Sequence, residues 1–248
     1  MNEHILELEP SAIWKYFKEI LAIPRPSKKE EKIIEYLLDF GKKYNLETTQ
    51  DEVGNVLIRK QATPGMENQK SVVLQSHIDM VCEKNSDKEH DFEKDPIETF
   101  IKDGWVYANG TTLGADDGIG VAAQLAILAA NDIKHGPIEC LFTVDEETGL
   151  SGAFGLQPGF LKSEILLNLD SEDEGQLFIG CAGGQDTLAW LPYDLEDAPS
   201  DHKAYKIMVS GLKGGHSGDD ISKGLGNANK MLNRFLWTYR QQFELKLH

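Results

Sequence analysis

Three neighbouring carboxylates, Asp145, Glu146 and Glu147, stand at the end of an apolar run in the segment TVDEETG (143–149). Like charges that lie this close repel one another and perturb one another's protonation. A solvated turn is the ordinary explanation of such a cluster. The alternative is a site in which carboxylates bind a cation or transfer a proton.

Polar residues follow apolar runs at three more places, namely SHID (76–79), GADDG (114–118) and LLNLD (166–170). His77 and Asp79 are two residues apart, and in extended backbone such residues share a face. A carboxylate beside an imidazole fixes its tautomer and raises its basicity, as is usual for a metal-bound histidine. The same pair is equally consistent with a structural hydrogen bond, and we expect one of Asp116 and Asp117 to cap a helix.

Together these places supply one histidine and several carboxylates, the ligand set of a divalent metal site. His77, Asp116 and Asp170 could hold one ion. Glu147, with Asp116 as a shared bridge, could begin a second ion site about 3.5–4 Å away, the spacing of two-metal hydrolases. Glu146 is then left uncoordinated, and a carboxylate beside a metal-activated water is what a general base requires.

The periodicity of the apolar side chains predicts the elements that must position these residues. Helices are predicted over 11–22, 28–44 and 117–131, the second opened by the capping box Ser27-x-x-Glu30. Strands are predicted over 46–50, 55–60, 71–76, 138–144 and 164–169, with the charged residues 83–104 as an excursion over the surface. This alternation indicates an α/β fold, with a mixed, mostly parallel sheet flanked by helices.

The pattern changes after the glycine-rich stretch GCAGG (180–184). Two strands over 186–192 and 203–211 are predicted to pair, and a helix over 222–241 is predicted to follow them. We interpret this change as the start of a second domain.

The composition limits what the site can be. With 248 residues, 40% of them hydrophobic, the chain can bury a full core. Its net charge of −16 argues against nucleic acid or an anionic membrane surface as a partner, because both require a basic footprint. No apolar stretch approaches the roughly 20 residues of a membrane span, the start MNEHILELEP is unlike a secretory signal, and three cysteines are too few for a disulfide framework. We therefore expect a cytoplasmic protein.

The motifs, taken in order, resemble those of a known family. His-x-Asp, Ala-Asp-Asp-Gly, Glu-Glu, Leu-Asp and Gly-Gly-His-Ser are similar to the co-catalytic zinc peptidases related to carboxypeptidase G and the aminoacylases. Longer stretches resemble the Xaa-His dipeptidases, also called aminoacyl-histidine dipeptidases: HDFEKDPI (90–97), GTTLGADDGIG (110–120), EETGLSGAFGL (146–156), LDSEDEG (169–175), GCAGG (180–184), GLKGGHSGDDI (211–221) and GLGNANK (224–230). The resemblance implies a catalytic domain over 1–183 and the first part of a smaller α+β lid and dimerisation domain over 184–248.

The resemblance also implies a role for each matching position. His77 and Asp170 match terminal ligands of one zinc, Asp116 the bridging carboxylate, and Glu147 a ligand of the other zinc. Glu146 matches the general base, Asp79 the residue that orients His77, and His216 a lid histidine that stabilises the oxyanion, often in the active site of a dimer partner. The expected cofactor is Zn²⁺, two ions per complete site, while Co²⁺ or Mn²⁺ could occupy the same positions.

Members of this family are longer than this chain. They complete the lid, return to the catalytic domain and supply a last histidine ligand to the zinc held by Glu147. This chain stops at His248, which follows the helix of an unfinished lid and is a poor match for that ligand. We therefore expect the 248-residue chain to bind one zinc more tightly than a second, and to hydrolyse dipeptides poorly unless a complementing piece is present.

The resemblance implies a zinc-dependent dipeptidase that acts on unblocked dipeptides, with Xaa-His dipeptides such as β-alanyl-histidine as candidate substrates and a homodimer formed through the lid domain. Two alternatives stay open. An N-acyl amino acid deacylase would use the same metals, and a truncated homologue could keep the fold as a non-catalytic metal-binding or interaction module.

Overall fold

The computed structural model describes residues 2–171, 173–181, 183–185, 187–215 and 220–246. The chain divides into two compact units, Met1–Leu177 and Phe178–His248. The domain boundary expected between residues 183 and 184 stays a prediction. Among the described residues, no helix combines the length and the apolar character needed to cross a lipid bilayer.

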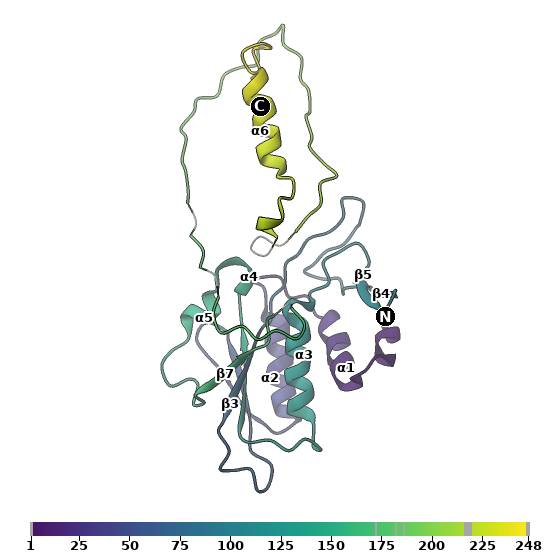
Figure 1. Ribbon diagram of the computed structural model, residues 1–248, viewed down its shortest axis with the longest axis vertical. Coiled ribbons are helices and arrows are strands. Elements are labelled where there is room, and N and C mark those ends of the chain that lie inside the picture. Colours follow the sequence, from purple (N-terminus) through teal and green to yellow (C-terminus); the bar gives the residue numbers. More distant parts are fainter. Residues whose placement is uncertain (1, 172, 182, 186, 216–219, 247–248) are drawn as a thin grey trace. The chain divides into compact units, whose positions relative to one another are not determined.

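A five-stranded mixed sheet forms the centre of the first unit, and Figure 1 labels two of its strands, β3 and β7. The strand order is β1-β2-β6-β3-β7. Its strands are β1 (Glu47–Gln50), β2 (Val56–Lys60), β3 (Val72–His77), β6 (Ile138–Thr143) and β7 (Ile165–Asn168). β6, β3 and β7 run parallel to one another, whereas β1 and β2 extend the sheet through antiparallel pairings. The predicted mixed sheet is confirmed, and the carboxyl ends of its three parallel strands lie at one edge.

Three helices cover one face of this sheet and form the main core with it. They are α1 (Ser11–Leu21), α2 (Glu31–Lys43) and α3 (Ala115–Ala129). α2 packs on β1 and β2. α3 packs on β3 and on α1 (Figure 1). Their apolar residues recur at helical spacing, so that Ile20, Leu37 and Leu125 are all fully buried.

Side chains alternate between the two faces of the sheet along each strand. Leu74 and Phe142 belong to the core beneath the helices, whereas Val73 and Leu141 belong to a smaller cluster on the other side. That cluster is completed by residues that follow the short helix α5 (Ser151–Gly155). The long helices of the described first unit thus gather on one face.

The segment predicted as a surface excursion contains a hairpin. β4 (Thr99–Lys102) pairs antiparallel with β5 (Trp105–Ala108), with Asp103 and Gly104 at the turn. Both turn residues have positive φ, 50° and 80°, which is the conformation that an Asp-Gly pair favours between two strands. The Asp-Gly pair is the sequence signal of this hairpin, which the predicted surface excursion did not include. Most residues over 83–104 are exposed, as a surface excursion requires.

The capping box predicted at the start of α2 is also wrong. The helix begins at Glu31 with no side-chain cap at its start. Ser27 Oγ instead donates a hydrogen bond to Oδ2 of Asp79 at 2.7 Å, and Oε1 of Glu30 accepts one from the backbone N–H of Asp145 at 3.0 Å. These two side chains bond to two distant loops, one after β3 and one after β6, because the buried groups there are stronger partners than a solvated helix end.

The second unit contains a helix but no strands among its described residues. Its elements are η2 (Ile221–Lys223) and α6 (Ala228–Tyr239), which begins where Asn227 Oδ1 accepts a hydrogen bond from Lys230 N at 2.9 Å. The strands predicted near 186–192 and 203–211 are wrong over the described residues of these ranges. Their apolar side chains find no packing surface there, since Trp190 is 89% exposed and Tyr205 is 81% exposed, and an isolated strand pair without a hydrophobic face is only marginally stable. The remaining elements of the chain are η1 (Glu3–Glu7) and α4 (Glu146–Gly149).

A buried carboxylate near the amino end of β6 gives the first testable prediction. Glu139 accepts hydrogen bonds from Nε of Arg59 at 2.8 Å and from the backbone N–H groups of Lys162 and Ser163 at 2.9 and 2.8 Å. Burial favours its protonated form, but these donors outweigh burial and lower its pKa below 4.5. The charged form therefore stabilises the fold above pH 4.5, and this contribution is lost as the pH falls through the lowered pKa.

We expect Glu139→Gln to lower the free energy of unfolding at pH 7 by about 1.5–3 kcal/mol, the range for hydrogen bonds to charged groups. Because the parent carboxylate is itself protonated in acid, the difference in unfolding free energy between parent and variant should shrink as the pH falls below 4.5 and through the lowered pKa. Urea unfolding of both proteins over a series of pH values measures this. A difference that stays constant across the series would show that the charge of Glu139 contributes nothing.

Candidate metal centre

The candidate site lies beyond the carboxyl ends of β6, β3 and β7, which is where open α/β sheets bind ligands. His77 is the last residue of β3, the acidic cluster 145–147 follows β6, and Asp170 lies just after β7. Asp116 stands near the start of α3, which packs on β3. The parallel pairing of the strands brings these distant parts of the sequence to one edge.

His77 is the centre of the group, and its side chain is 1% exposed. Its Nε2 lies 2.9 Å from Oδ1 of Asp116 and 3.9 Å from Oδ2 of Asp170. With Glu146 and Glu147 it forms a second group, in which the potential ligand atoms all lie within 4.8 Å of one another. His77 is the residue common to the two groups. The sequence predicts instead that Asp116 bridges the two ions, and that role stays a prediction.

Asp79 joins the two groups through a dense set of hydrogen bonds. Its side chain is fully buried, and Oδ1 lies 3.3 Å from Nδ1 of His77. Oδ1 also accepts from the backbone N–H of Glu146 at 3.0 Å, and Oδ2 accepts from that of Glu147 at 3.1 Å. Ser27 Oγ is a further donor to Oδ2. One carboxylate therefore holds both the imidazole and the start of the acidic helix α4.

Asp145, the third member of the acidic cluster, is structural. It is 4% exposed, its carboxylate accepts hydrogen bonds from the hydroxyl groups of Thr148 and Ser151, and its backbone N–H donates to Glu30. It has a φ of 51° at the N-cap of α4. Both carboxylate oxygens of Asp145 are engaged by these hydroxyl groups, which makes it a hydrogen-bonding neighbour of the site.

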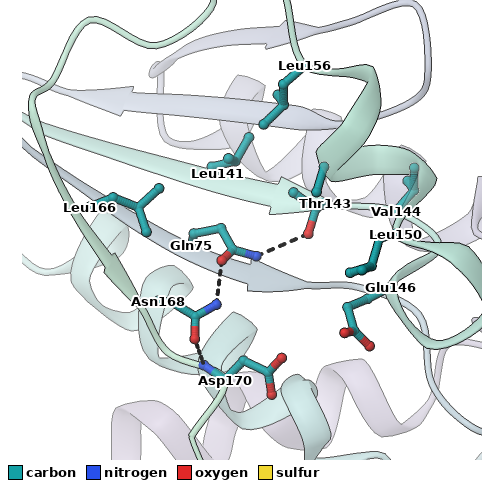
Figure 2. Close-up of a pocket in the computed structure, with 11 residues that line it drawn as sticks. Gln75, Leu141, Thr143, Val144, Glu146, Leu150, Leu156, Leu166, Asn168 and Asp170 are labelled. Atoms are coloured by element: carbon teal, nitrogen blue, oxygen red, sulfur yellow. Dashed lines mark hydrogen bonds between the residues drawn. The ribbon is translucent and has the colours of Figure 1, made fainter. Parts of the chain in front are cut away.

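A ladder of side-chain hydrogen bonds crosses the three parallel strands and ends at Asp170 (Figure 2). Nε2 of Gln75 donates to Oγ1 of Thr143 at 3.1 Å, and Oε1 of Gln75 accepts from Nδ2 of Asn168 at 2.6 Å. Oδ1 of Asn168 then accepts from the backbone N–H of Asp170 at 3.1 Å. The ladder fixes the position of Asp170 relative to β3 and lines a cavity of about 220 Å³ that Glu146 also borders.

The proximity of the carboxylates is visible in their pKa values. Burial and the Asp116 carboxylate raise the pKa of Glu147 to about 7 and that of Asp170 to about 6. Burial and the Asp170 carboxylate raise the pKa of Asp117 to about 8. For His77, burial disfavours the charged ring, but hydrogen bonds to the neighbouring carboxylates raise its pKa to about 11. The group is thus an accumulation of negative charge that a divalent cation would neutralise.

The side chains present fit a metal ion of the zinc type. One imidazole and several carboxylates are the donors such ions take. Ligands bound at about 2.0–2.1 Å in a tetrahedron lie roughly 3.3 Å apart, and the two separations from Nε2 of His77, 2.9 and 3.9 Å, fall on either side of that value. In addition, Oδ2 of Asp117 is buried with no hydrogen-bond partner among the described residues.

The structure brings together six of the seven residues singled out from the sequence: His77, Asp79, Asp116, Glu146, Glu147 and Asp170. His216 lies outside the described residues, as does His248. The expectation that Asp116 or Asp117 caps a helix stays a prediction. The residue at the cap position of α3 is Gly114, and the non-helical backbone angles of Asp116 and Asp117 mark a kink within the first turn. The sequence did not indicate that Arg25, Ser27 and Glu30 contact the site. The one signal available was that polar residues cluster in the connection between two helices.

A mixed α/β sheet with one histidine and several carboxylates beyond its parallel strands is the arrangement of metal-dependent hydrolases. Residues 73–196 match the model of peptidase family M20/M25/M40. The chain belongs to this family.

Relatives of known sequence and structure agree with this assignment. The chain is 51% identical over 241 residues to the cytosol non-specific dipeptidase of Escherichia coli, a match that covers 97% of the chain and 50% of the relative. It resembles the crystal structure of the aminoacylhistidine dipeptidase from Vibrio alginolyticus with a TM-score of 0.72 and 47% identity, over 98% of the chain and 50% of that structure. It is also 30% identical over 135 residues to the succinyl-diaminopimelate desuccinylase of a Nitratiruptor species, covering 53% of the chain and 33% of that relative. The chain spans about half the length of the first two.

Proposed function

We propose that this protein is a zinc-dependent dipeptidase that hydrolyses the peptide bond of unblocked dipeptides, with Xaa-His dipeptides among its substrates. The observation that carries the proposal is the position of Nε2 of His77, 2.9 Å from Asp116 and 3.9 Å from Asp170 at the edge where the parallel strands end. The names of the two most similar of these relatives, both dipeptidases, support the substrate class.

Each residue of the group has a definite task in this proposal. His77, Asp116 and Asp170 bind one ion, and Glu147 belongs to the site of a second. A zinc ion held there supplies Lewis-acid polarisation of the scissile carbonyl and lowers the pKa of water. Nδ1–H of His77 donates to the backbone carbonyl of Asp79 at 3.2 Å and lies 3.3 Å from its carboxylate, which leaves the lone pair of Nε2 to face the cation.

In this proposal the carboxylate of Glu146 is the group that transfers the proton. Its backbone N–H is held by Oδ1 of Asp79 at 3.0 Å, and its side chain borders the cavity of Figure 2. A carboxylate oxygen in this position can take the proton of the attacking water and later pass it to the leaving amine. The proposal also includes His216 as an oxyanion-stabilising residue, a homodimer formed through the lid domain, and a location in the cytoplasm.

A second function, hydrolysis of N-acyl amino acids, has one observation in its favour. The desuccinylase relative, as its name states, removes an acyl group rather than an amino acid, and it is 30% identical over about half of this chain. The two functions share a metal centre and differ in whether the substrate has a free amino group.

A side-by-side assay of β-alanyl-histidine, other unblocked dipeptides and an N-acetylated amino acid separates them. Because the chain spans about half the length of its dipeptidase relatives, each assay includes the C-terminal half of the Escherichia coli relative as a complementing piece, with zinc added. We expect turnover of the dipeptides only, abolished by a chelator and restored by Zn²⁺. Turnover of the acetylated substrate alone would establish a deacylase instead. Metal binding without turnover of either substrate would show that the protein is a non-catalytic metal-binding module.

A further inference from the structure

Arg25 lies in the connection between α1 and α2, and its side chain is almost entirely enclosed, at 2% exposure. Its Nη1 donates hydrogen bonds to the backbone carbonyls of Ile78 at 3.0 Å and Asp79 at 2.7 Å. Its Nη2 donates to the backbone carbonyl of Gly114. The guanidinium group therefore joins two loops that lie about 35 residues apart in the sequence, through three carbonyl oxygens.

The two loops are those that carry ligands of the candidate metal centre. Ile78 and Asp79 directly follow His77, and Gly114 lies two residues before Asp116. The backbone of Arg25 adds a further link to the first loop, since its carbonyl accepts a hydrogen bond from the N–H of Met80 at 3.2 Å. One side chain thus bridges the loop that follows His77 and the loop that precedes Asp116.

Two glycines leave the space that the guanidinium occupies. A Cβ atom on Gly114 would lie 2.5 Å from Nη2 of Arg25, and a Cβ on Gly118 would lie 2.7 Å from the same atom. Gly114 also has a φ of 68°, a conformation that side chains disfavour. The two glycines of GADDG, on either side of Asp116 and Asp117, therefore provide the room that the Arg25 side chain needs.

The charge of Arg25 is not needed to fill this space, because an apolar side chain would fill it as well. Burial of a charge is costly unless the charge has partners. Burial lowers the pKa of Arg25 to about 10, while the carboxylates of Asp79, Asp117 and Asp116 act in the opposite direction. The group stays charged at neutral pH and lies beneath the accumulated negative charge of the site. Its fixed fork of donors, which a lysine lacks, matches three carbonyls in different directions.

We propose that Arg25 is a positioning residue of the metal centre, whose guanidinium group holds the loop after β3 and the loop before α3 at the spacing that lets His77 and Asp116 bind one cation together. This inference rests on the metal centre of the proposed function and is independent of the substrate. The positive charge of Arg25 would by itself repel a cation, so its favourable effect on metal binding comes from the hydrogen bonds.

Arg25→Lys isolates that effect, because it keeps the charge and removes the fork. Zn²⁺ is titrated by calorimetry into the metal-free 248-residue chain and into the variant, and the visible absorption of bound Co²⁺ reports the geometry of the ligands. We expect Arg25→Lys to weaken the tighter Zn²⁺ site by about 10–100-fold, the usual effect of removing a residue that orients a metal ligand, and to change the Co²⁺ spectrum.

Arg59→Lys is the matched control. Arg59 is also largely buried and uses all three of its nitrogens, donating to Glu139, Glu47 and the carbonyl of Phe160, but it binds near the opposite end of β6 from the site. Its replacement should lower the thermal unfolding temperature and leave the Zn²⁺ affinity and the Co²⁺ spectrum unchanged. Equal Zn²⁺ affinity in Arg25→Lys and the parent, or equal losses in Arg25→Lys and Arg59→Lys, would overturn the inference. A parent chain that fails to bind Zn²⁺ would instead overturn the proposed metal centre.

Gly118→Ala provides a second test that does not depend on how well Arg25→Lys folds. Alanine favours a helix more than glycine does, yet its Cβ would displace the guanidinium group of Arg25. We expect this variant to fold and to bind Zn²⁺ at least 10-fold more weakly than the parent, the lower end of the range for a lost orienting contact. A folded Gly118→Ala protein with the affinity of the parent would contradict the role of Arg25.

Discussion

Replacing Glu146 with Gln is expected to lower kcat for dipeptide hydrolysis, assayed with the complementing C-terminal half, by about 10²–10⁴-fold, the contribution typical of a general base. The amide keeps the size of the side chain but cannot accept a proton. The backbone N–H of Glu146 would still donate to Asp79, so the helix that carries both glutamates should stay in place. Zinc content should therefore remain close to that of the parent protein, and elemental analysis alongside steady-state kinetics measures both quantities.

Glu147→Gln is the matched control, because the two residues are adjacent and both donate backbone hydrogen bonds to Asp79. This variant should lose zinc from the second site, with activity falling in proportion to the metal lost. If Glu146→Gln loses zinc while the rate per bound ion is preserved, the tasks of the two glutamates must be exchanged. If both variants keep zinc and full activity, neither residue is the base.

Asp79→Ala is expected to reduce the free energy of unfolding by about 3–5 kcal/mol, the effect of removing one partner from a buried charged network. Its side chain is fully buried and receives hydrogen bonds from Ser27 and from the backbone of Glu146 and Glu147. Alanine leaves these donors without a partner and removes the carboxylate 3.3 Å from Nδ1 of His77, which then keeps only the backbone carbonyl of position 79, 3.2 Å away. We therefore expect zinc affinity to fall together with stability, as measured by urea unfolding of the metal-free chain and by zinc titration.

Glu139→Ala separates the two effects. Glu139 is also a buried carboxylate that accepts two backbone N–H hydrogen bonds and one from a side chain, but it lies near the amino end of β6. Its removal should reduce stability and leave zinc affinity unchanged. A loss of zinc affinity in Glu139→Ala as large as that in Asp79→Ala would mean that the metal site responds to general destabilisation rather than to the loss of Asp79.

Much of the fold could be predicted from local patterns. The helices around Ile20, Leu37 and Leu125 have the apolar spacing of their element and a buried face in the structure, and the strands β2, β3 and β6 are apolar and largely buried. The outer strands β1 and β7 form where they are predicted, although none of their residues is buried. The predicted strands of the second unit failed for the opposite reason. Residues such as Trp190 have the composition of a strand, but the described part of that unit gives them no surface to pack on.

The sequence by itself determined which residue types stand at the ends of the apolar runs: a histidine, a carboxylate two residues later, and further carboxylates after two more strands. Chain order does not specify distance, so the parallel pairing of β3 with β7 and the packing of α3 on β3 decided that His77, Asp116 and Asp170 meet. Tertiary structure alone also decided the partners of Arg25, Ser27 and Glu30. Their local pattern indicated a helix connection with a cap, but hydrogen bonds to buried loops far along the chain are stronger than those to a helix end in water.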